Sequence, residues 1–70
     1  MTEWLWYSDN KGELEDLIRE AVQFFEEKYQ EKAVLVYVKD PDGLKTVDGV
    51  AVEKRSNILP RHIWVVGEKT

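Results

Sequence analysis

The chain has 70 residues, a net charge of −4 and no cysteine. This length allows one small domain, whose single core supplies only about 3–5 kcal/mol of net stability, and without cysteine neither disulfides nor thiolate metal sites can supplement it. The excess of acids argues against non-specific binding to nucleic acids or to anionic membranes, because both depend on an excess of Lys and Arg. Good packing and oligomerisation are the remaining ways to supplement the core.

No segment is predicted to cross a membrane. The longest unbroken apolar run is Ala33–Val38, whereas a spanning helix needs about 20 apolar residues. The first residues, Met1–Glu3, lack the basic and then apolar segments of a signal peptide. A soluble cytoplasmic protein is therefore expected, and the charged fraction of 34% would suit a thermophilic source.

The first predicted element is a strand over residues 3–8. Its aromatic residues favour a pleated surface. The alternation places Trp4 and Trp6 on one face of the strand and Leu5 and Tyr7 on the other. Turn-forming residues then end the strand.

A long amphipathic helix is predicted from about residue 13 to residue 32. Asn10 stands three residues before Glu13, which is the spacing of a capping box at a helix N-terminus. Apolar residues recur along one broad face and charged residues fill the other. The acidic outer face is expected to be a solvated surface, with the binding of a basic partner as the alternative. The apolar face consists of Leu14, Leu17, Ile18, Ala21, Val22, Phe24, Phe25 and Tyr29.

The second half of the chain is predicted to form strands. Residues 33–38 are wholly apolar, as expected of a strand that is buried on both faces or central in a sheet. "VDGV" at 47–50 places two turn residues between valines and favours a tight hairpin. Because its flanks are short, the alternative is that Asp48 and Gly49 only lead into the next strand. Residues 50–55 alternate as a strand, and residues 61–66 form the last one.

These elements predict one α+β domain over residues 1–70. A single, mainly antiparallel sheet of roughly three to five strands carries the helix on one face, in the order strand, helix, strand, optional strand and two final strands. The last two strands are expected to pair with each other in antiparallel fashion around "SNILP" at 56–60. A domain of two layers leaves the second face of its sheet uncovered.

The alternation in the last strand bears on the three tryptophans. If Ile63 and Val65 meet the helix, Trp64 lies on the uncovered face, and the same alternation can place Trp4 and Trp6 beside it. An exposed aromatic patch of this kind marks an interaction site. The sequence therefore allows three tryptophans to converge on one open surface.

The opposite arrangement is equally compatible with the pattern. Trp4 and Trp6 can instead point inward and pack against Phe24 and Phe25. A domain this small has few large apolar side chains, and burying an aromatic ring removes more area from water than burying an aliphatic side chain. The sequence pattern is therefore compatible with both orientations.

A basic group is the second candidate site. Lys54 and Arg55 precede "SNILP", while Arg61 and His62 follow it, so pairing of the two strands would bring these side chains together. Such a group can bind an anion or phosphate, or a single-stranded nucleic acid with Trp64 stacked on a base. The simpler interpretation is that the charges protect strand ends from edge pairing.

The sequence contains no recognisable catalytic or metal-binding motif. His62 is the only histidine and there is no cysteine, whereas a zinc site needs three or four protein ligands, mostly of these types. Ser8 and Ser56 do not lie in a nucleophile elbow, and the glycines form no phosphate-binding fingerprint. Neither an enzyme nor a cofactor is expected.

The sequence favours a non-catalytic interaction module, an accessory or regulatory protein. It is expected to bind a protein partner or to form a homodimer, through the uncovered sheet face or a strand edge. The alternative is a small nucleic-acid- or anion-binding protein that uses the four basic residues. The expected interaction residues are Trp4, Trp6 and Trp64 as anchors, with Arg55, Arg61 and His62 as a polar rim.

Overall fold

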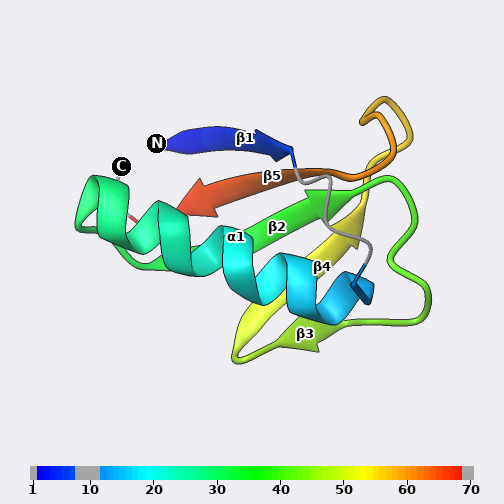
Figure 1. The fold of residues 1–70 in the computed structure, drawn as a ribbon, viewed down its shortest axis with the longest axis horizontal. Helices are drawn as coiled ribbons and strands as arrows, with labels where there is room; N and C mark the ends of the chain where they lie inside the picture. Colours follow the sequence, from blue (N-terminus) through cyan, green and yellow to red (C-terminus); the bar gives the residue numbers. More distant parts are fainter. Residues whose placement is uncertain (1, 8–11, 69–70) are drawn as a thin grey trace.

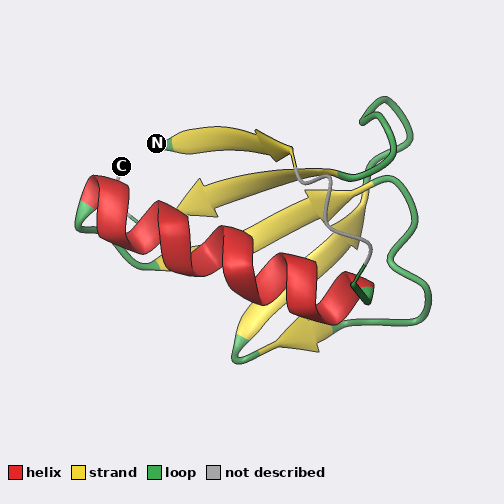
Figure 2. Ribbon diagram, viewed as in Figure 1, coloured by secondary structure: helices red, strands yellow, loops and turns green. Residues whose placement is uncertain are grey.

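The computed structural model describes residues 2–7 and 12–68. The elements of these residues are β1 (Glu3–Tyr7), α1 (Leu14–Tyr29), β2 (Ala33–Val38), β3 (Thr46–Val47), β4 (Val50–Lys54) and β5 (His62–Gly67). The five strands form one mixed sheet in the order β1-β5-β2-β4-β3, and the helix lies across one face of it (Figure 1, Figure 2). The prediction of a two-layer α+β domain is confirmed.

The strand order corrects one expectation. β1–β5, β2–β5 and β3–β4 are antiparallel pairs, whereas β2 and β4 pair in parallel. The predicted pairing of the last two strands is wrong, because β2 lies between β4 and β5. β2 carries no charged side chain, and the centre of a sheet is the place where a strand leaves the fewest groups in contact with water.

The helix is shorter at both ends than the predicted range 13–32. Gln30 adopts the left-handed conformation with φ 54°, and its N–H donates to the Glu26 carbonyl at 3.0 Å, which ends the helix. The N-cap is Glu13, which makes no side-chain capping hydrogen bond, and Asn10 lies outside the described residues. No helix within residues 2–7 and 12–68 is long and apolar enough to span a membrane.

The hydrophobic core lies between α1 and the sheet. It combines the inner face of the helix with the inward residues of β2 and β5. The helical spacing of apolar residues and the alternation along the strands both predict this arrangement. Ile63 and Val65 are buried, so the face of β5 that carries these two residues meets the helix. The largest fully buried side chains are Phe25, Ile18, Ile63, Val36 and Val65.

The predicted hairpin at 47–50 is confirmed. Asp48 and Gly49 both have positive φ, 50° and 83°, and they join β3 to β4 with Val47 opposite Val50. Two residues of positive φ give the turn a twist that matches the twist of the flanking strands.

Gly67, at the end of β5, provides a first testable prediction. A Cβ at this position would lie 2.9 Å from Cζ of Phe25 and would overlap the Glu31 carboxylate. Because the Phe25 ring is fully buried, it has no free space into which to move. We expect Gly67→Ala to lower the free energy of unfolding by about 1–3 kcal/mol in urea titrations.

Gly43→Ala is the matched control. A Cβ there meets nothing within 4 Å, but φ is 84°, so its cost is conformational and amounts to about 1 kcal/mol. If Gly67→Ala proved neutral, the close approach of β5 to Phe25 would be contradicted.

Candidate interaction surface

Trp64 lies on the open face of the sheet, the face opposite α1. Its cross-strand neighbours are Leu5 on β1 and Tyr37 on β2. Its indole Nε1 donates to Oε1 of Glu3 at 2.9 Å, and its ring is half-buried. This is the position that the alternation predicts when the neighbouring residues of β5 meet the helix.

Trp4 and Trp6 lie on the other face of the sheet, against α1. The Trp4 ring centroid is 6.5 Å from those of both Phe25 and Tyr29, and the Trp6 centroid is 6.2 Å from that of Phe24. The convergence of three tryptophans on one surface is therefore wrong, and the inward arrangement holds for these two. The register sets them opposite the core-facing residues of β5, where their rings add to a small core.

The exposed apolar side chains gather along β1. On the open face Leu5 is 52% exposed and Tyr7 57% exposed. On the helix side Phe24 and Tyr29 are 46% and 37% exposed, and they contact the two tryptophans of β1. Four of the six large exposed apolar residues in the described chain thus border one strand. We call Leu5, Tyr7, Phe24 and Tyr29 the β1 border.

β1 is an edge strand, because β5 is its only neighbour among the strands of residues 2–7 and 12–68 (Figure 1). The N–H of Gly67 donates to the Thr2 carbonyl at 2.8 Å. The N–H and C=O groups of successive residues in a strand point to opposite sides. Because the C=O of Thr2 faces β5, the other even-numbered residues of β1 also turn their N–H and C=O groups towards β5. The odd-numbered residues Glu3, Leu5 and Tyr7 turn theirs towards the free edge, where another strand can bind.

β1 has few of the features that protect sheet edges from pairing, such as Lys, Pro or a very short strand. Its one charged residue, Glu3, accepts a hydrogen bond from Trp64 on the open face. The opposite edge, β3, has only two residues before the turn at Asp48. The two edges therefore differ: β3 is protected by its length and β1 is open.

Arg55 lies on the open face. Its guanidinium carbon is 3.9 Å from the ring centroid of Tyr37 and 5.3 Å from that of Trp64. Cations in such positions are attracted to the negative face of an aromatic ring. Arg55 and the two rings therefore form a mixed aromatic and cationic platform beside β1.

Lys54 and Arg55, at the end of β4, lie across β2 from Arg61 and His62, at the start of β5, two strand spacings or about 10 Å away. The Arg55 side chain extends across β2, so that its guanidinium carbon lies 5.3 Å from the ring centroid of Trp64 on β5. Arg61 and His62 line a separate cavity of about 360 Å³ near the start of α1. The His62 ring also packs 4.9 Å from Tyr7, which joins it to the β1 border.

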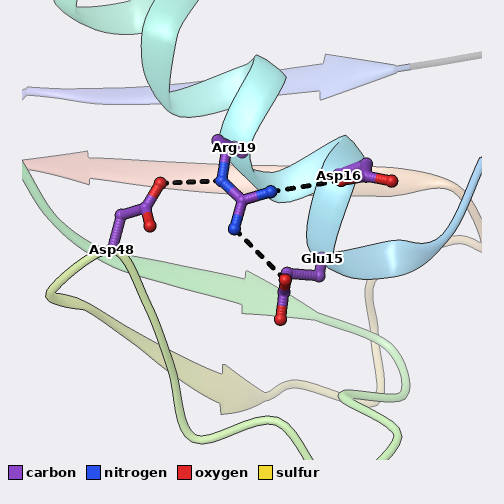
Figure 3. A network of polar contacts seen from close by, with 4 residues as sticks. All are labelled: Glu15, Asp16, Arg19 and Asp48. Atoms are coloured by element: carbon purple, nitrogen blue, oxygen red, sulfur yellow. Dashed lines mark hydrogen bonds and ion pairs between the residues drawn. The ribbon is translucent and has the colours of Figure 1, made fainter.

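On the outer face of α1, Arg19 holds three carboxylates (Figure 3). It donates to Asp48 at 2.8 Å and to Asp16 and Glu15 at 3.1 Å each. The hydrogen bonds to Asp48 and then Glu15 raise the pKa of Arg19 above its ordinary value. Because the folded-state pKa is raised, any contribution to folding is present at ordinary pH and is lost only in strong alkali. The network links α1 to the β3–β4 turn through Asp48, and as an exposed network it contributes little stability.

The β1 border combines residues that the sequence interpretation assigned elsewhere. The strand alternation allows Leu5 and Tyr7 to face inward, and the helical spacing predicts Phe24 and Tyr29 on the apolar face of the helix. Phe24 lies at the margin of the apolar arc of the helix, and that position was the available signal. Tyr29 is the last residue of α1, which the predicted range 13–32 did not give. In the described part of the chain, no group of three or more His, Asp or Glu side chains is placed to hold a metal ion. No protein-family model, curated protein or solved structure matches this chain.

Proposed function

We propose that this protein is a non-catalytic protein–protein interaction module and that the β1 edge with the β1 border is its binding surface. The supporting observation is the concentration of exposed apolar side chains on both faces of an open edge strand. Addition of a strand from a partner suits this geometry, because backbone hydrogen bonds supply affinity and the flanking side chains supply specificity.

The predicted interaction residues take different roles in this proposal. Trp4 and Trp6 support the border from the helix side, since their rings contact its aromatic members. Trp64 supports Leu5 from the neighbouring strand. His62 packs on Tyr7 and belongs to the polar rim. A rim of polar groups around aromatic anchors is the usual composition of a protein interface.

Binding of single-stranded nucleic acid is the second candidate function. The observation that favours it is the platform of Arg55, Tyr37 and Trp64 on the open face, because bases stack on aromatic rings and phosphates pair with Arg. The acidic balance of the chain disfavours it. The two functions differ in their dependence on salt.

The proposed function is tested by selecting displayed random peptides on the protein immobilised at low density, so that each copy presents a free β1 edge. We expect extended peptides that remain bound in about 0.5 M NaCl, where exposed charges are screened. Tyr7→Lys should weaken them roughly tenfold or more, a loss of about 1.4 kcal/mol. Thr46→Lys is the matched control, because it adds the same charge to an exposed residue on the other edge.

Selected peptides whose affinity is the same for the Tyr7→Lys variant as for the natural chain would contradict the proposal. Titration with a single-stranded oligonucleotide, followed by tryptophan fluorescence, tests the second candidate. Binding that is tight at low salt and lost at high salt would favour nucleic acid over a protein partner.

A further inference from the structure

We propose that the occupant of the β1 edge is a second copy of this chain, paired through an antiparallel β1–β1 contact centred on Leu5. This inference rests on the proposed function, because it names the partner of the same surface. The result is one continuous sheet across two copies, with a two-fold axis at Leu5.

The outward backbone groups are self-complementary in this register. Only the odd-numbered residues of β1 face the free edge. An axis at Leu5 sets Leu5 opposite its own copy and Glu3 opposite Tyr7 of the second copy. Each outward N–H then meets an outward C=O along the whole strand, and any shifted register leaves part of the strand unpaired.

The same register brings the aromatic residues on the helix side together. Trp4 of one copy lies opposite Trp6 of the other in a pair without backbone hydrogen bonds, where Cα atoms are about 4.5 Å apart and side chains are closest. Phe24 and Tyr29, which contact these rings in each copy, flank the new contact. In this register the β1 border of each copy lies next to that of the other.

The charges and the second edge are compatible with a closed dimer. The antiparallel pairing keeps the two Glu3 carboxylates four residues apart along the strand, about 13 Å, whereas an in-register parallel pairing would set them side by side. Association stops at two copies because the remaining edge, β3, offers only two residues.

Size gives an independent reason for a second copy. A chain of 70 residues without cysteine buries a modest core, and oligomerisation is one of the few remaining ways to stabilise it. A homodimer also needs no feature from outside this sequence, since each side supplies the strand that the other lacks.

Cysteine cross-linking tests the axis directly, because the natural chain has no cysteine to interfere. Hydrogen-bonded antiparallel neighbours have Cα atoms about 5.5 Å apart, which is within disulfide range. Under mild oxidation Leu5→Cys should form a disulfide-linked dimer roughly tenfold faster than Thr46→Cys, the control on the other edge.

The register has its own test. Glu3→Cys and Tyr7→Cys should each cross-link slowly alone and rapidly when mixed, because residue 3 of one copy lies opposite residue 7 of the other. Efficient cross-linking of Glu3→Cys alone would overturn the antiparallel register.

Light scattering during size exclusion, over a wide dilution series, gives the mass in solution. We expect twice the chain mass of 8.2 kDa, retained in about 0.5 M NaCl. Leu5→Lys should raise the dissociation constant roughly tenfold or more, because it sets two like charges opposite each other. Leu5 is 52% exposed, so the variant is expected to stay folded, and circular dichroism checks this.

A strict monomer up to about 1 mM overturns the second copy as partner. If that monomer still captures peptides in a way that depends on Tyr7, the proposed function stands and only its occupant is wrong. If neither peptides nor a second copy bind at β1, both proposals fail.

Discussion

Phe25→Ala is expected to unfold about half of the protein at room temperature. Phe25 is 0% exposed, and its ring centroid lies 6.5 Å from that of Trp4 and 5.0 Å from that of Tyr29. Removing a fully buried phenylalanine costs about 3–5 kcal/mol, which equals the net stability of about 3–5 kcal/mol available to a domain of this size. Far-UV and near-UV circular dichroism at one fixed protein concentration measures the loss.

Phe24→Ala is the matched control, on the adjacent residue of the same helix. Phe24 is 46% exposed and contacts Trp6, so we expect a loss of less than about 1.5 kcal/mol and a folded variant. Similar losses for the two variants would contradict the orientation of α1. Since Phe24 belongs to the β1 border, its replacement is also expected to weaken self-association.

Trp64→Ala is expected to lower the free energy of unfolding by about 2 kcal/mol and to leave the protein folded. The ring is half-buried between Leu5 and Tyr37, so its removal exposes the open face without emptying the main core. The variant also leaves the Arg55 guanidinium with one aromatic ring in place of two. Urea titration followed by far-UV circular dichroism measures the change.

Trp64→Phe separates the two contributions of the indole. It keeps an aromatic ring beside Leu5 and removes the hydrogen bond from Nε1 to Glu3. The expected loss is about 1 kcal/mol, the net value of one hydrogen bond. No change in either Trp64 variant would mean that the open face has no packing role around this residue.

The sequence alone determined the elements and the local turns. The helical spacing of apolar residues over 14–29 predicts a helix whatever surface that helix packs against. Asp48 with Gly49 predicts a two-residue turn because both residues tolerate positive φ. The alternation of β1 likewise separates Trp4 and Trp6 from Leu5 and Tyr7. These properties depend on neighbours along the chain, so a single sequence was sufficient to predict them.

Only the tertiary structure decided which face of each strand meets the helix and which strands lie at the edges. Alternation defines two faces without saying which is buried, and the choice for Trp4 and Trp6 depends on their register with β5. The insertion of β2 between β4 and β5 separated the end of β4 from the start of β5, and β1, which pairs with β5 alone among the described strands, lies at an edge. Strand pairing joins residues far apart in sequence, and its free energy depends on contacts that no local pattern contains.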